Sequence, residues 1–183
     1  MLNSAEMEKK ISEILSKMTL SEKIGQLNLV GRSPVGGVEV TIAEKREMLE
    51  KGMITVEEFE NDMENQILDG QEDDIACGKI GGFLGITDPV LVNHLQKIAV
   101  EKSKNGIPLI MGQDVIHGLW TVFPIPLAES CTFDDELMEE TAAAAAQEAW
   151  EHGVDWTYAP MIDIARDARW GRIAEGAGED TYL

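Results

Sequence analysis

Three short apolar runs alternate with helical segments in the second half of the sequence, and this alternation limits the folds open to the chain. The runs lie at residues 78–86, at the stretch that begins with Ile107, and at residues 154–162. Residues 88–99 and 134–152 fill the intervals with helical patterns. Strand–helix–strand connections of this kind are right-handed and build a parallel sheet. We therefore predict an α/β fold.

The two intervening helices carry start and stop signals. Asp88-Pro89 places a capping carboxylate and a first-turn proline at the start of the first helix. The second helix begins at Asp134, contains an alanine run that ends at Ala149, and stops at Gly153. Alanine side chains are small enough to let this helix lie close to a sheet. The first helix is predicted to bury one face, made of Leu91, Leu95, Ile98 and Ala99.

The middle run ends abruptly at Asp114, and a His117-Gly118 turn follows. Continuous aliphatic residues are typical of a buried parallel strand, and ligands bind at the carboxyl ends of such strands. Asp114 is therefore a candidate site residue, although an Asp after a strand also commonly caps the next helix. Asp163 ends the third run and would lie at the same edge. Residues 119–127 contain two prolines, which predicts an extended loop.

The first 75 residues form a predicted helical lead-in, and residues 76–183 form the first βα units. The opening helix covers residues 7–18, and Thr19-Leu-Ser-Glu22 has the form of a capping box. This box starts a second helix that carries Ile24, Leu27 and Val30. The apolar stripe of the opening helix is predicted to contain Ile11, Ile14, Leu15 and Met18.

Residues 41–70 are dense in charge and contain two further capping boxes, Thr41–Glu44 and Thr55–Glu58. Glycines 52 and 70 suit the ends of two helices. We interpret this segment as a solvated helical hairpin inserted in the lead-in. A contact surface for a partner protein, in a small α/β interaction module, is the alternative.

The chain has 183 residues and a formal charge of −19, which disfavours binding to phosphate backbones or anionic membranes. Cys77 and Cys131 are far apart and predict neither a zinc site nor a disulfide framework. The glycines of residues 78–86 lack the G-x-G-x-x-G spacing of a dinucleotide site, so no cofactor or metal is expected. Residues 1–20 are charged rather than apolar, which predicts no signal peptide and a cytoplasmic location.

Six segments in order resemble the N-terminal part of glycoside hydrolase family 3 β-glucosidases, of the bacterial periplasmic type. The resemblance spans nearly the whole chain except about residues 31–74. The segments are KMTLSEKIGQL at 17–27, GIPL at 106–109, DVIHG at 114–118, TVFPIPL at 121–127, APMIDIARD at 159–167, and RWGR at 169–172 with Glu179-Asp180 after it.

This resemblance implies part of a (β/α)8 TIM-like barrel, about its first three βα units, and retaining hydrolysis of terminal β-D-glucosyl residues. Retaining hydrolysis needs two carboxyl groups about 5–5.5 Å apart. In the family both lie farther along the polypeptide, so we expect no catalytic residue before Leu183. Three strands are too few to close a barrel of about 250 residues, so we expect the chain to be a fragment whose missing C-terminal part completes the enzyme.

Two sugar-binding residues are implied by the resemblance. Asp114 matches the aspartate that binds sugar hydroxyls in the −1 subsite, and its two oxygens can accept two hydroxyl hydrogen bonds. Arg172 matches the arginine of the Trp-Gly-Arg motif, which also reaches that sugar. Trp170 is interpreted as a packed loop aromatic, although it could stack on a sugar.

The other polar residues near these motifs receive structural interpretations. Arg166 and Arg169 are expected to form ion pairs, and His117 is expected to be an orienting hydrogen-bond partner or a turn residue. No Ser or Cys accompanies His117, which argues against nucleophilic catalysis of the triad type. The partners considered for the two arginines are Asp163, Asp167, Glu175 and Asp180.

Three functional alternatives stay open at this point. The DVIHG form differs from the Asp-x-Glu-Gly-Gly-like sequence of the family's N-acetylhexosaminidase branch, but it does not separate β-glucosidase from β-xylosidase. A non-catalytic sugar-binding remnant would use the same Asp114 and Arg172. The expected ligand is a β-glucoside or an oligosaccharide in each enzymatic reading.

Overall fold

The computed structural model describes residues 4–31, 47–58 and 71–183. The chain divides into two compact units. The first comprises Met1–Gly81 and Leu95–Leu109, and the second comprises Gly82–His94 and Ile110–Leu183. No helix among the described residues is both long and apolar enough to cross a bilayer. Within the same ranges, no three His, Cys, Asp or Glu side chains are grouped to hold a metal ion.

The first unit begins with helix α1 (Ser4–Lys17), helix α2 (Leu20–Gly25) and strand β1 (Leu29–Gly31). The predicted capping box at the start of α2 is confirmed. Thr19 N–H donates to the Glu22 carboxylate at 2.6 Å, and Glu22 N–H donates to Thr19 Oγ1 at 3.2 Å. The unit also contains α5 (Gln71–Ala76) and the π-helical turn η1 (Ile98–Lys102).

The prediction that α2 continues to Val30 is wrong, because the helix ends at Gly25. Gly25 lies directly against the backbone of Gly78, where a Cβ would be 2.0 Å from the carbonyl oxygen. The chain then turns to pair with this neighbour: Asn28 Nδ2 donates to Lys79 O, and Gly81 N–H donates to Asn28 O, both at 3.0 Å. These long-range bonds draw the residues after Gly25 out of the helix.

Three residues of the face predicted on residues 88–99 are buried in the first unit, namely Leu95, Ile98 and Ala99, and Ile75 and Leu109 of the same unit are buried too. Leu91, which belongs to the second unit, is only half-buried. The stripe predicted for the opening helix is covered only in part: Met18 is buried and Ile14 is half-buried, whereas Ile11 and Leu15 are about half exposed.

Helix α6 (Pro89–Lys97) begins as predicted, with the Asp88 carboxylate accepting from Val90 N–H at 2.9 Å and Leu91 N–H at 3.0 Å. Near its other end, Gln96 binds the backbone of Leu109 twice. Its amide donates to Leu109 O at 2.8 Å and accepts from Leu109 N–H at 2.9 Å. Because these bonds occupy the backbone of Leu109, the strand predicted from Ile107 begins later, at Ile110.

The charged hairpin segment is described only in part. Residues 47–50 are helical, and Gly52 follows with φ +67° and donates its N–H to Leu49 O at 3.0 Å, as expected at a helix end. The Thr55–Glu58 box is confirmed by Glu58 N–H donating to Thr55 Oγ1 at 3.1 Å. The Thr41 box and the end predicted at Gly70 lie outside the described residues.

The second unit contains three parallel strands, β2 (Gly82–Leu84), β3 (Ile110–Gln113) and β4 (Trp156–Thr157). Their order places β3 in the middle, with Gly82 paired to Ile110 and Gly112 paired to Trp156. This arrangement confirms the predicted parallel α/β fold class. Helix α7 (Pro126–Ser130), helix α8 (Asp135–Glu151) and the 3-10 turn η2 (Ile173–Glu175) complete the unit.

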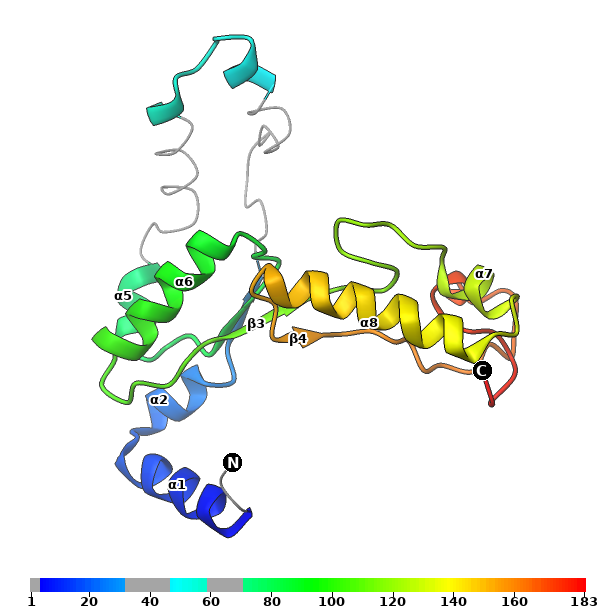
Figure 1. Ribbon diagram of the computed structural model, residues 1–183. Coiled ribbons are helices and arrows are strands. Elements are labelled where there is room, and N and C mark those ends of the chain that lie inside the picture. The colour runs from blue at the N-terminus through cyan, green and yellow to red at the C-terminus, as the bar shows by residue number, and fades with distance from the viewer. Residues whose placement is uncertain (1–3, 32–46, 59–70) are drawn as a thin grey trace. The chain divides into compact units, whose positions relative to one another are not determined.

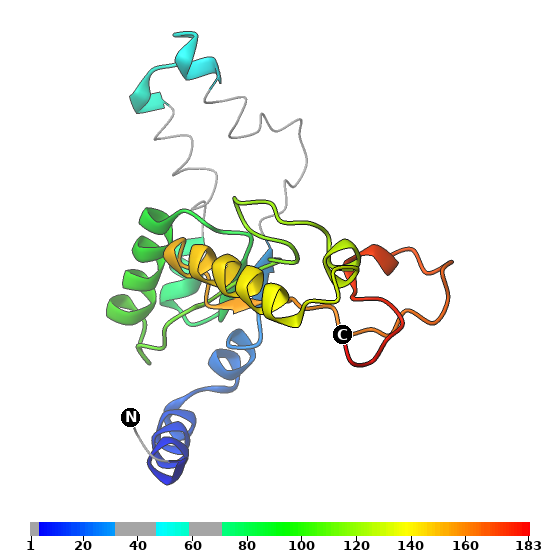
Figure 2. The same cartoon turned by 45° about the vertical axis from the view of Figure 1, so that its right-hand side comes forward.

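Helix α8 runs alongside β4 in both views (Figures 1 and 2). Its predicted bounds are confirmed: Asp134 accepts from Leu137 N–H at 3.0 Å, and Gly153 follows the helix with φ +82°. Ala145 and Ala149 are buried, so the small residues do allow close packing. They form one apolar cluster with Val115 and Val154, which follow β3 and precede β4.

Three boundaries of the second unit differ from the predictions. The strand predicted for residues 78–86 covers only Gly82–Leu84. The loop predicted for residues 119–127 ends earlier, because Pro126 occupies the first turn of α7 and Leu127 is helical. The strand predicted for residues 154–162 forms a regular ladder only at Trp156–Thr157, with a further isolated bridge from Met161 to Gly176. Pro160, which follows a cis peptide bond, has no N–H to donate to a ladder.

Candidate functional site

Asp114 lies where the sequence places it, one residue after β3, and its side chain is exposed. No helix starts at this point, because residues 114–125 form turns and loops up to α7. The alternative that Asp114 caps a following helix is therefore excluded. Asp114 projects from the carboxyl end of the middle strand, which is the edge where parallel α/β folds bind ligands.

His117 closes the loop that follows Asp114. Its Nδ1 lies 3.0 Å from Phe123 O, and since a carbonyl only accepts, Nδ1 donates. Phe123 N–H in turn donates to His117 O at 2.8 Å. His117 thus acts as a hydrogen-bond partner that fixes the loop, as expected. Gly118 adopts φ +105° inside this loop, and a Cβ there would be 1.8 Å from Thr121 O.

Arg172 is held by a carboxylate three residues later. Its Nε donates to Glu175 Oε1 at 2.9 Å, and its Nη2 donates to Glu175 Oε2 at 2.5 Å. This pair raises the pKa of Arg172 and lowers the pKa of Glu175 below its ordinary value of 4.5. Nη1 makes no hydrogen bond with any described residue, so one edge of the guanidinium remains able to donate.

Asp114 and Asp163 lie close enough to Arg172 for their charges to act on it. After the Glu175 hydrogen bond, the Coulombic attraction of these two carboxylates also raises the pKa of Arg172. The described residues show no hydrogen bond or ion pair between Arg172 and either of these carboxylates, so Asp114 and Asp163 act on Arg172 through their charge alone. Arg172 can donate hydrogen bonds to hydroxyl groups, and the carboxylates of Asp114 and Asp163 can accept them.

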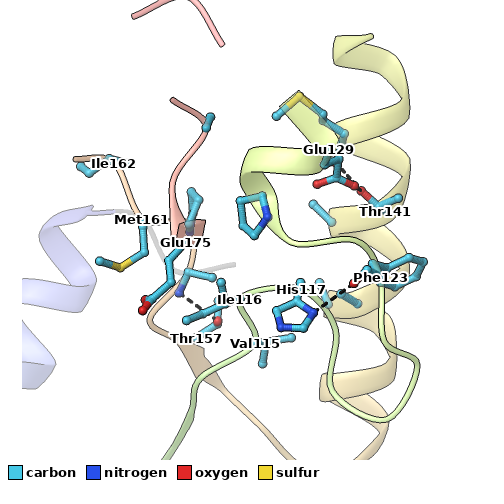
Figure 3. Close-up of a pocket in the computed structure, with 18 of the residues that line it drawn as sticks. Val115, Ile116, His117, Phe123, Glu129, Thr141, Thr157, Met161, Ile162 and Glu175 are labelled. Atoms are coloured by element: carbon cyan, nitrogen blue, oxygen red, sulfur yellow. Dashed lines mark hydrogen bonds between the residues drawn. The ribbon is translucent and has the colours of Figure 1, made fainter. Parts of the chain in front are cut away.

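A cavity of about 960 Å³ lies beside this cluster, and its lining is mostly apolar. Figure 3 shows Met161 and Glu175 on one side of it and Glu129 and Thr141, which hydrogen-bond to each other, on the other. Glu175 and Asp163 line the cavity, whereas neither Asp114 nor Arg172 is among the described residues of its wall. The carboxylate that holds Arg172 thus also faces the cavity.

The other arginines differ in their partners. Arg169 pairs with Asp167, with Nε donating to Oδ1 at 2.9 Å, as expected, and this pair lowers the pKa of Asp167. The expectation that Glu175 serves Arg166 or Arg169 is wrong, because Arg172 binds both of its oxygens. Arg166 forms no ion pair with the part of the chain that the structure describes. Trp170 is half-buried in the loop.

Sequence reasoning missed the contacts of two acidic residues of this region, and Glu175 was considered only as a partner of Arg166 or Arg169. Glu175 lies three residues after Arg172, a spacing that favours pairing on a helical turn, and this signal was present in the sequence. Glu148 lies in α8, and its carboxylate accepts from the backbone N–H groups of Trp120 at 2.8 Å and Thr121 at 3.0 Å. A separation of 27 and 28 residues gives no local signal for this contact.

The comparison with protein families gives a match over residues 19–183, to the glycosyl hydrolase family 3 N terminal domain. The periplasmic beta-glucosidase of Salmonella typhimurium is 34% identical over 173 residues, which cover 94% of this chain and 19% of that protein. A putative beta-xylosidase of Formosa agariphila is 27% identical over 188 residues, which cover 98% of this chain and 22% of that protein.

Solved structures agree with this assignment. The beta-glucosidase from Listeria innocua in complex with isofagomine superposes with a TM-score of 0.68 at 32% identity, covering 99% of this chain and 21% of that one. A mutant of the same enzyme in complex with laminaribiose gives 0.68 at 33% identity, covering 95% and 22%. The chain spans about a fifth of the length of these relatives. The chain belongs to glycosyl hydrolase family 3.

Proposed function

We propose that this chain forms the N-terminal part of a retaining β-glucosidase and supplies two residues that bind the terminal sugar, Asp114 and Arg172. The observation that carries the proposal is the position of Asp114 directly after β3, at the carboxyl edge of the parallel sheet, together with the Glu175 pair that holds Arg172 and leaves its Nη1 without a partner among the described residues. Beta-glucosidases among the relatives, one of them solved with glucose, support the substrate class.

The chemistry of the two groups suits a pyranose. The Asp114 carboxylate accepts hydrogen bonds from sugar hydroxyls and can bind two at once. Arg172 donates from its open Nη1 edge, while Glu175 fixes the plane of the guanidinium through Nε and Nη2. Because hydroxyls both donate and accept, alternating carboxylate and guanidinium groups can bind neighbouring hydroxyls of one ring.

The proposal assigns no catalytic residue to residues 1–183. Retaining hydrolysis uses one carboxylate as nucleophile and a second carboxyl group as acid and base, about 5–5.5 Å apart. We place both on polypeptide beyond Leu183, which is the missing part that the chain needs as a partner. Asp114 and Arg172 bind the terminal sugar and orient its anomeric carbon toward the nucleophile.

Hydrolysis of 4-nitrophenyl β-D-glucoside by the protein as its gene encodes it tests this function. Arg172→Lys keeps the charge but loses the fork, so kcat/KM should fall by roughly 10–100-fold. Arg166→Lys is the matched control, since Arg166 has no ion pair in the described region, and should change kcat/KM by less than about twofold. Full activity in Arg172→Lys would contradict the proposed role of Arg172.

A β-xylosidase of the same family is the second candidate, because beta-xylosidases of Formosa agariphila are also among the relatives. Xylosides lack the hydroxymethyl group of glucosides. Parallel assays on 4-nitrophenyl β-D-glucoside and β-D-xyloside separate the two: we expect the larger kcat/KM on the glucoside. A preference for the xyloside would select the second candidate, and binding of sugar with no hydrolysis of either would select a non-catalytic sugar-binding protein.

A further inference from the structure

Backbone N–H groups of the loop after Asp114 are hydrogen-bonded by a side chain of α8. The neck of this loop is closed by His117 and Phe123, but the N–H groups of the residues between them find no backbone acceptor among the described residues. Unpaired N–H groups at a loop tip normally bind water and leave the loop free to move. In this protein a carboxylate from α8 accepts from two of these N–H groups, those of Trp120 and Thr121.

Glu148 accepts several hydrogen bonds from this loop. Its Oε2 accepts from Trp120 N–H at 2.8 Å and from Thr121 N–H at 3.0 Å, and its Oε1 accepts from the Thr121 hydroxyl at 2.9 Å. These bonds, led by Thr121 N–H and Trp120 N–H, lower the pKa of Glu148, and Leu119 N–H contributes to the same effect. Hydrogen bonds from N–H to a carboxylate are stronger than those to a neutral acceptor.

A second contact joins the same two elements one helical turn later. The ring of His152 lies 5.9 Å from the ring of Trp120, and His152 Nδ1 donates to Glu148 O at 2.8 Å. Glu148 forms no ion pair with any described Lys or Arg. The negative charge of Glu148 is therefore stabilised by N–H groups of the loop that point toward it. The orientation of the loop consequently depends on the Glu148 side chain.

We propose that Glu148 is a positioning residue for sugar binding: it fixes the loop of residues 117–123 to α8 and thereby sets Asp114 at the end of β3. The inference rests on the proposed function. Only Val115 and Ile116 separate Asp114 from this loop, and Val115 is buried in the cluster with Ala145 and Ala149 of α8. Val115 and Glu148 thus anchor the short segment that follows Asp114 to α8 at two points.

Glu148→Gln tests the inference with little change in size, because it removes the charge and one of the two acceptor oxygens. Glu151→Gln is the matched control, since Glu151 is exposed at the end of the same helix and, among the described residues, its carboxylate accepts a hydrogen bond from Gln147 and from no other side chain. Thr121→Val is a second variant that removes one hydrogen bond from the loop side. Each is made in the protein as its gene encodes it.

Two measurements are compared in each variant, glucose affinity by calorimetry and hydrogen–deuterium exchange of peptides that cover residues 117–123. For Glu148→Gln we expect roughly tenfold weaker glucose binding and faster exchange in this loop, at a temperature where the variant is folded. Thr121→Val should change both in the same direction by less. Glu148→Asp, which keeps the charge and both oxygens, should recover part of the affinity. Glu151→Gln should change neither.

Faster loop exchange together with unchanged glucose affinity in Glu148→Gln would overturn the inference, because the loop would then move without affecting the sugar. Unchanged exchange would overturn it as well, since the carboxylate would not hold the loop. If Glu148→Gln fails to fold, the same criteria apply to Thr121→Val. A wild-type protein that binds no glucose would instead refute the proposed function, so the two failures are distinguishable.

Discussion

Glu175 binds Arg172 along one edge of its guanidinium and leaves the opposite Nη1 without a partner among the described residues. The bonds join Nε to Oε1 at 2.9 Å and Nη2 to Oε2 at 2.5 Å. Asp114 and Asp163 act on the same guanidinium through their charge. Because Glu175 holds one edge of the Arg172 guanidinium and Nη1 remains able to donate, Arg172 is preorganised to bind a ligand.

Removing the carboxylate of this pair should weaken sugar binding without unfolding the protein. Glu175→Gln leaves one oxygen to accept from Arg172, so the guanidinium loses its fixed plane and glucose affinity should fall by roughly tenfold. The Arg172 side chain is 57% exposed, so the melting temperature should change little.

The control for this change is Glu179→Gln, which removes the same charge from an exposed residue of the same segment. Calorimetric titration with glucose should give the wild-type affinity for Glu179→Gln. Equal affinities for the Glu175→Gln and wild-type proteins would show that the ion pair does not serve the sugar.

The loop after Asp114 should not tolerate a side chain at Gly118. Gly118→Ala forces an L-residue into φ +105° and places a Cβ 1.8 Å from Thr121 O. The backbone conformation alone costs about 1–3 kcal/mol, and the clash adds to it. Gly171→Ala has no heavy atom within 4 Å of its Cβ and should be close to neutral. Urea unfolding that finds the two variants equally stable would contradict this geometry.

Helix α8 should depend on its capping carboxylate. Asp134 accepts from Leu137 N–H, so Asp134→Ala should lower the free energy of unfolding by about 1 kcal/mol. Asp135→Ala removes a neighbouring charge without removing this bond and should cost less. Thermal unfolding followed by circular dichroism measures the difference, and an equal effect of the two substitutions would argue against the cap.

The contribution of Glu148 to stability should disappear in acid. Backbone N–H donors of Thr121 and Trp120 lower its pKa in the folded protein, so the unfolded chain binds a proton first as pH falls. The carboxylate therefore stabilises the fold above the ordinary pKa of 4.5, and this contribution is lost as pH falls through the lowered pKa. The stability difference between wild type and Glu148→Gln should be constant near neutral pH and shrink below about pH 4.5. A difference that grows in acid would contradict the assignment.

Local signals account for most of what the sequence predicted correctly. The Thr19 capping box, the Asp88 and Asp134 caps and the stop at Gly153 each depend on residues a few positions apart, and the structure confirms them. The parallel direction of the strands followed from their alternation with helices, because a helix that connects two strands of one sheet forms a right-handed crossover and leaves the strands parallel.

The errors come from contacts between distant residues. Helix α2 ends early because Gly25 meets Gly78, and β3 starts late because Gln96 binds the backbone of Leu109. Asp114 was a candidate from the end of its strand and from the family motifs, and Arg172 from the motifs alone, and their sugar-binding roles stay predictions. Glu148 contacts its loop across 27 residues, and no local pattern reveals it. The cytoplasmic location and the division of the chain at residue 75 stay predictions.

The direct test of the account is the kcat/KM of Asp114→Asn on 4-nitrophenyl β-D-glucoside, measured in the protein as its gene encodes it. Asparagine has the same shape but only one acceptor oxygen and no charge, so a sugar hydroxyl loses its partner and kcat/KM should fall by at least about 100-fold. Asp135→Asn, an exposed control on α8, should stay within about twofold of wild type. Activity of Asp114→Asn equal to that of the control would show that Asp114 does not bind the substrate.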